Sequence, residues 1–120
     1  MTIERPVGDP AVAYQDAPDY DDEMAWLRTH TDTPGFEQSR EFWLRRAALL
    51  DRIALRETEA YGPEATVPLI RQAQAAAAEL VEYDTAHHGL SPKGADLTAG
   101  EDHREYVREE YRVWSLSQTN

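Results

Sequence analysis

The clearest pattern of hydrophobic positions runs through residues 42–61, FWLRRAALLDRIALRETEAY. Its apolar side chains recur at steps of three, four and seven residues, which places them on one face of a helix with 3.6 residues per turn. They are Phe42, Trp43, Leu49, Leu50, Ile53, Ala60 and Tyr61. Charged side chains fall on the far side, where they stay hydrated. The pattern predicts a long amphipathic helix that lines the core of a small domain and needs partners along its apolar face.

Turn and capping residues extend this helix and place a second one beside it. A threonine–proline pair favours a start near residue 34, and the glycine–proline pair at 62–63 ends the helix. Thr66 is placed to cap a following helix that continues to about residue 88. Four consecutive alanines, 75–78, give that helix a smooth side that another backbone can approach closely. We therefore expect an antiparallel hairpin of residues 34–61 and 66–88.

Shorter helices are predicted before and after the hairpin. Asp19 is placed to cap a helix over YDDEMAWLRTH, in which Met24 and Leu27 share one face. Thr98 and Glu101 match a capping box for a helix that ends near residue 116. Its apolar face holds Tyr106, Val107, Tyr111 and Trp114. No segment alternates as a strand does. The predicted fold class is all-α, a small four-helix bundle-like domain built on the hairpin.

The N-terminal residues differ from the rest of the chain. Residues 1–18 contain three prolines and a glycine but few large apolar groups, so little offsets the entropy lost on ordering them. We expect an extended N-terminal arm over 1–18, a single helical domain over 19–116 and a frayed tail over 117–120.

Composition excludes several kinds of site. The chain has 120 residues, enough to bury an apolar core without disulfides or metals, and it has no cysteine. Disulfides, thiolate nucleophiles and zinc–thiolate centres are therefore excluded. No apolar run reaches the length of a signal peptide or a membrane span, which favours a cytoplasmic protein with no membrane partner. A net charge of −11 argues against direct nucleic-acid binding, because phosphate contacts need a basic surface.

A second apolar stripe on the central helix is the main candidate for an interaction site. Leu44, Ala48 and Leu55 lie off the main face at spacings of four and seven. They are flanked by three arginines, Arg45, Arg52 and Arg56. Such a stripe is covered within the chain, by the first helix or the arm, or it binds a partner through its arginine and aromatic anchors. Trp26, off the stripe of its own helix, either closes the core edge or adds to that surface.

Chemistry-bearing side chains are few. Asp84 and His88 are four residues apart, and His87 shares a face with Glu79 and Tyr83, so Asp84, His87 and His88 form a weak candidate metal site. A histidine in the last turn of a helix also has a structural reason to be there. No serine lies in a nucleophile-elbow context and no glycine-rich phosphate loop occurs. The sequence therefore favours a non-catalytic protein without a cofactor.

Three functions are compatible with these features. The first is a helical protein–protein interaction or regulatory protein that binds another protein or a second copy of itself. The second is an acidic decoy that binds a basic nucleic-acid-binding protein. The third is a bundle that holds a metal or a small molecule, the latter near a set of phenols. These are Tyr61, Tyr83, Tyr106 and Tyr111. The first requires no residue that the chain lacks, and we take it as the expectation.

Overall fold

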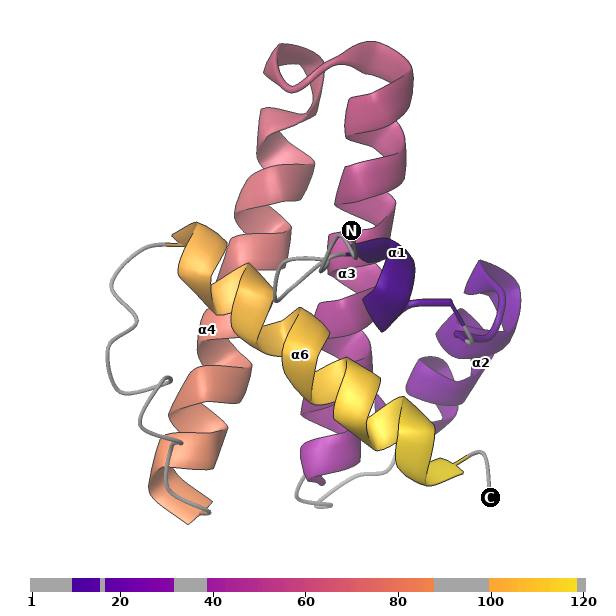
Figure 1. Ribbon diagram of the computed structural model, residues 1–120, viewed down its shortest axis with the longest axis vertical. Helices are drawn as coiled ribbons and strands as arrows, with labels where there is room; N and C mark the ends of the chain where they lie inside the picture. The colour runs from indigo at the N-terminus through magenta and orange to yellow at the C-terminus, as the bar shows by residue number, and fades with distance from the viewer. Residues whose placement is uncertain (1–9, 16, 32–38, 88–99, 119–120) are drawn as a thin grey trace, which may run out of the picture.

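The computed structural model describes residues 10–15, 17–31, 39–87 and 100–118, and the regular elements in these ranges are all helical. They are α1 (Pro10–Ala13), α2 (Tyr20–Thr31), α3 (Arg40–Tyr61), the 3-10 turn η1 (Glu64–Thr66), α4 (Val67–His87) and α6 (Gly100–Gln118). The predicted all-α fold class is confirmed. Figure 1 shows α3 and α4 as an upright hairpin, with α2 beside α3. Since α6 crosses the hairpin obliquely, the arrangement resembles a regular four-helix bundle only loosely.

The hairpin is set by residues at its ends. Ser39 caps α3, because its Oγ accepts a hydrogen bond from the Phe42 amide at 3.3 Å. The other end of α3 is Gly62, whose φ of 87° is the left-handed conformation that glycine tolerates, and whose N–H donates to Thr58 O at 2.8 Å. Thr66 does not cap α4 as predicted, because its hydroxyl donates back to Gly62 O at 3.1 Å and so closes the turn. The predicted start near residue 34 lies outside the described residues.

The core lies where α6 crosses the two helices of the hairpin. Its buried cluster consists of Leu44, Ala47, Ala48, Ala76, Ala77, Leu80, Val107 and Tyr111. Alanines supply half of this cluster, and their small side chains let the α3 and α4 backbones approach closely, as the alanine run predicted. The core is therefore thin between α3 and α4, and its largest fully buried side chain, Tyr111, comes from α6.

The N-terminal segment is more ordered than the sequence indicated. Residues 10–13 form one helical turn instead of an extended arm, Ala13 is only 4% exposed, and the Tyr14 hydroxyl reaches Asp51 in α3. Burial of these side chains offsets the ordering cost that the composition led us to expect. Asp19 caps α2 as predicted, since its Oδ1 accepts from the Asp22 amide at 2.9 Å. Residues 1–9 are not described.

The C-terminal helix also extends further than predicted. Residues 117 and 118, expected to fray, are the last two of α6. The predicted capping box cannot be placed, because Thr98 and the side chain of Glu101 fall outside the described residues.

Candidate functional site

Three carboxylates lie in the interior of the protein, on α2, α3 and α4. Glu23, Asp51 and Asp84 are each 1% exposed, and each accepts hydrogen bonds from arginine. A buried carboxylate that lost its partner would destabilise a fold by about 3–5 kcal/mol, so these pairs are structural requirements of the chain. They also fix how the helices lie against one another, and so where a groove is left between them.

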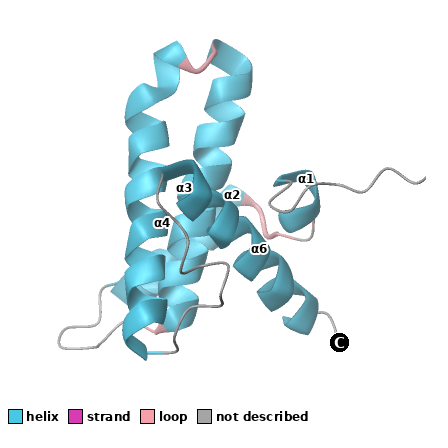
Figure 2. Cartoon of the chain, turned by 60° about the vertical axis from the view of Figure 1, so that its left-hand side comes forward, coloured by secondary structure: helices cyan, strands magenta, loops and turns pink. Residues whose placement is uncertain are grey.

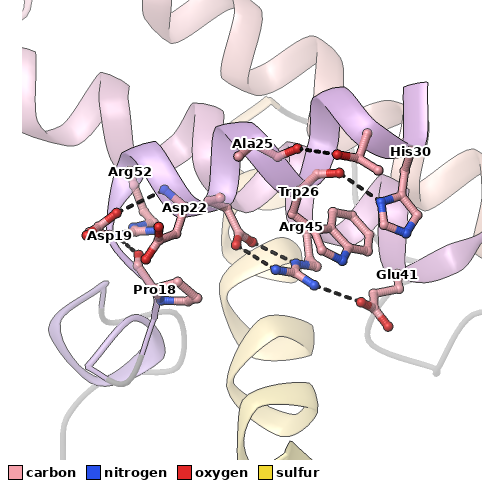
Figure 3. Close-up of polar contacts among 11 residues, drawn as sticks. Pro18, Asp19, Asp22, Ala25, Trp26, His30, Glu41, Arg45 and Arg52 are labelled. Carbon is pink, nitrogen blue, oxygen red and sulfur yellow. Dashed lines mark hydrogen bonds and ion pairs between the residues drawn. The ribbon is translucent and has the colours of Figure 1, made fainter. Parts of the chain in front are cut away.

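Glu23 fixes α2 against α3. Arg45 donates from Nε and Nη2 to the two Glu23 oxygens at 2.8 and 2.7 Å, and from Nη1 to Glu41 at 2.8 Å. Its guanidinium lies 3.8 Å from the centroid of the Trp26 ring, and His30 stacks on the same indole (Figure 3). The bidentate ion pair and the cation–π contact together fix the distance between α2 and α3 and the rotation of α2 about its own axis.

Asp51 joins α3 to α6 and to the N-terminal segment. Arg104 Nε donates to its Oδ1 at 2.6 Å, and Arg108 donates from Nε to Oδ2 at 2.7 Å and from Nη2 to Oδ1 at 2.9 Å. The Tyr14 hydroxyl donates to Oδ2 at 2.6 Å. Burial, and then the negative charge of Asp51, raise the pKa of Tyr14 well above its ordinary value. The phenol therefore remains a hydrogen-bond donor at physiological pH.

Asp84 joins α4 to both α3 and α6. Arg40 donates from Nε and Nη2 to its two oxygens at 2.8 and 2.9 Å, and the Tyr106 hydroxyl donates to Oδ2 at 2.6 Å. Arg40 Nη2 also donates to Glu110 at 2.7 Å. The hydrogen bonds to Asp84 raise the pKa of Arg40, and burial followed by the same carboxylate raises the pKa of Tyr106. Each helix of this region is thus connected to the others by charged hydrogen bonds.

The candidate metal site is not assembled in this arrangement. Both Asp84 oxygens are taken by Arg40 and Tyr106, while His87 is exposed, stacks on Tyr83 and has its Nδ1 3.0 Å from Tyr83 O. His88 lies outside the described residues. Within those residues, no group of three potential metal-ligating side chains is found. The carboxylate that the sequence offered as a metal ligand therefore serves as an arginine acceptor.

The candidate interaction stripe on α3 is largely internal. Leu44 is 0% exposed and Ala48 is 1% exposed, and both belong to the core cluster. They are covered within the single chain, by α4 and α6, so the sequence was wrong to place them on a surface that a partner could reach. Leu55 is half-buried. The alternative interpretation, cover from within the chain, holds for Leu44 and Ala48. Residues of α4 and α6 share their cluster, and Tyr14 and Ala17 of the expected N-terminal arm pack against it.

The polar members of the predicted surface lie between α2 and α3. Arg45 is engaged by Glu23 and Glu41 as described, and Trp26 is half-buried against it. Arg52 donates to Pro18 O at 2.8 Å, and both Arg52 and Arg56 lie over the Tyr20 ring, 4.5 and 4.3 Å from its centroid. These residues attach α2 to the hairpin. Only Arg56 is exposed among them.

An open groove instead follows the face of α3 that the sequence predicted to be the main apolar face. It has a volume of about 420 Å³ and lies between α2, α3 and α4. Its lining is Met24, Leu27, Phe42, Arg46, Leu49, Leu50, Gln72 and Ala75. Phe42 and Leu49 are buried and form its base, whereas Met24 and Ala75 are exposed and form its rim. The face that was expected to pack in the core is thus only partly covered.

The tyrosines proposed to surround a small molecule do not converge. Tyr61 ends α3 beside the turn and is 71% exposed, whereas Tyr83 is near the far end of α4. Tyr106 is committed to Asp84, and Tyr111 is buried in the core. The four phenols therefore do not form one site.

Comparison of the chain with models of protein families, with curated proteins and with solved structures found no match. Among the helices that the structure describes, none is both long and apolar enough to cross a membrane. Any assignment of function therefore depends on the geometry above.

Proposed function

We propose that the protein is a small helical interaction protein that holds an amphipathic helix of a partner protein in the groove between α2, α3 and α4. The observation that carries this proposal is the groove, an apolar opening of about 420 Å³ on a chain with a net charge of −11. Grooves between helices are a recurrent docking site for amphipathic helices, which insert side chains at positions i, i+3, i+4 and i+7. A volume of this size accepts one or two large apolar side chains.

The residues at the edge of the groove suit this role. Met24 is 42% exposed, and Ala75 presents only a methyl group to the opening. Arg46 and Gln72 add polar groups, and Arg46 donates to Glu79 at 2.6 Å across α3 and α4. The groove thus combines an apolar base with two polar side chains at its edge, and protein interfaces commonly have an apolar centre and polar groups at the periphery.

The walls of the groove are already fixed in the free protein. The Glu23–Arg45 pair holds α2, and close alanine packing holds α4 against α3. A partner therefore needs to order few groups when it binds, which lowers the entropic cost of association.

The test is the binding of a synthetic amphipathic helix with leucines on one face and neutral glutamines on the other, measured by fluorescence anisotropy. Ala75→Trp should weaken binding at least about tenfold, because the indole fills the groove, and a tenfold change corresponds to about 1.4 kcal/mol. Ala86→Trp is the matched control, since Ala86 is an exposed alanine of the same helix outside the groove lining.

Both variants change exposed side chains, and their helicity is checked by circular dichroism. The control should bind within about twofold of the wild type, since its groove is unchanged. An unchanged affinity of Ala75→Trp, or no binding of the neutral helix to the wild type, would remove the groove as the docking site.

A further inference from the structure

The direction of α2 shows where the groove opens. Tyr20, the first residue of α2, lies under Arg52 and Arg56 of α3, whereas Glu23, one turn later, pairs with Arg45. The helix α2 therefore runs antiparallel to α3, and its N-terminus points toward the Gly62 turn. The part of the hairpin between Tyr20 and the Gly62 turn is therefore not covered by α2.

Figures 1 and 2 both show the turn end of the hairpin standing clear of α1, α2 and α6. On α3, Ile53 lies one turn beyond Leu49 and Leu50 on the same helical face. On α4, Leu69 lies one turn before Gln72. Both Ile53 and Leu69 are half-buried, so the apolar lining continues past the end of α2. Tyr61 and Val67, 71% and 38% exposed, lie at the turn itself.

The extended surface has room for a short helix. Leu50 and Tyr61 are eleven residues apart on α3, which at 1.5 Å per residue is about 16 Å. A partner helix of about three turns would span this length. It would lie beside α2, with its first apolar side chains in the groove and the rest along the uncovered hairpin.

Acidic side chains outnumber basic ones in the two segments at the open end, the start of α2 and the turn end of the hairpin. Asp19, Asp21 and Asp22 are exposed at the start of α2. The hairpin segment 53–72 contributes three glutamates and two arginines, and Arg56 of this segment is in contact with Tyr20. A cation on the partner would therefore meet opposite charge at this end of the groove.

We propose that the partner helix is basic, with lysines or arginines flanking its apolar face and directed toward the α2 N-terminus and the hairpin end. This inference rests on the proposed function and specifies the chemistry of its partner. A second copy of this chain carries the same net charge of −11, so its approach is opposed, whereas a basic partner is attracted and oriented.

The experiment compares lysine, glutamine and glutamate versions of the same amphipathic helix. The lysine version should bind at least about tenfold more tightly than the glutamate version at low salt, and the difference should shrink in 0.5 M salt as the charges are screened. Asp21→Asn with Asp22→Asn should weaken the lysine version about threefold or more. Glu82→Gln with Glu105→Gln changes the net charge equally at exposed sites on α4 and α6 and should change affinity less than about twofold.

Each outcome distinguishes the inference from the proposed function. If all three helices bind equally and Ala75→Trp abolishes binding, the groove remains the docking site and the proposal of a basic partner is wrong. If both double variants weaken binding of the lysine helix equally, the helix is attracted by the net charge of the whole protein and not by the α2 N-terminus, and the inference fails. Light scattering tests whether a second copy of the chain occupies the groove. A dimer that Ala75→Trp dissociates would place a second copy there and overturn the proposal of a basic partner.

Discussion

Tyr111 carries its hydroxyl into the core without a hydrogen-bond partner among the described residues, and replacing it with phenylalanine should stabilise the protein. The side chain is 1% exposed and packs against Tyr14 and Trp114. A buried polar group left unpaired costs about 1–3 kcal/mol, whereas a phenylalanine ring keeps the same packing. We therefore expect Tyr111→Phe to raise the free energy of unfolding by about 1 kcal/mol at neutral pH.

The same substitution should change the response to alkali. Burial, followed by the charge of Glu23, raises the pKa of Tyr111 to about 12 from an ordinary value of 10.0. The folded state therefore favours the neutral phenol over its ionised form. Below pH 10 the phenol is neutral in both the folded and the unfolded state, whereas between pH 10 and 12 it ionises first in the unfolded chain, so the free energy of unfolding falls as the pH rises. Two pKa units correspond to about 3 kcal/mol. In Tyr111→Phe this part of the decrease in the free energy of unfolding at alkaline pH should be absent.

Urea unfolding followed by circular dichroism, at neutral pH and between pH 10 and 12, measures both effects. Tyr106→Phe is the contrasting variant, because it removes a hydrogen bond to a buried carboxylate and should lose about 2 kcal/mol. Tyr61→Phe, at an exposed phenol, should leave stability unchanged. A loss of stability in Tyr111→Phe as large as that in Tyr106→Phe would show that the Tyr111 hydroxyl has a partner and would refute the reasoning.

Two further substitutions test the interior. Asp51→Asn should destabilise the protein by about 3 kcal/mol or more in urea, because it removes the charge that Arg104 and Arg108 share inside the core; a loss as small as that of Glu82→Gln would contradict this role. Leu44→Ala should cost about 3 kcal/mol and half-buried Leu55→Ala about 1 kcal/mol, and equal losses would mean that the two leucines share one environment.

The helices themselves follow from local features of the sequence. Gly62 can adopt a positive φ and ends α3, and Asp19 can accept from the amide of Asp22 and begins α2, both where the sequence predicted. Such signals depend on a few neighbouring residues, so one sequence is enough to find them. The all-α class and the hairpin follow from the same kind of information.

The faces of α3 were harder to assign, because burial there depends on three other helices. The large side chains Phe42, Leu49 and Leu50 indicated one core face, but the most enclosed side includes Ala47, Ala48 and Asp51. Alanine gives a weak hydrophobic signal, although it permits the closest packing of helices. An aspartate within an apolar stripe is interpreted as a solvent-facing charge as long as its arginine partners are not known. Those arginines are more than fifty residues away in sequence.

One signal in the sequence could have identified the ion pairs. Asp84 follows Leu80 by four residues, and Asp51 follows Leu44 by seven, so each carboxylate falls in line with buried leucines. A charge that interrupts an apolar stripe in register predicts a charged partner on the facing helix. The groove had no comparable signal, because it depends on where α2 stops along the hairpin.

The long sequence separation between Asp51 and its arginines affects how the chain assembles. Helices α3 and α4 are joined by a tight turn, so their contacts close a short loop, whereas α6 can dock only after a much longer stretch has been closed. Within the described residues, the core cluster of the hairpin is completed by Val107 and Tyr111 of α6. Until Arg104 and Arg108 have been added and can reach Asp51, the nascent chain lacks the side chains that α6 adds to this cluster, and it presents the part of the hairpin that they cover to water or to a chaperone.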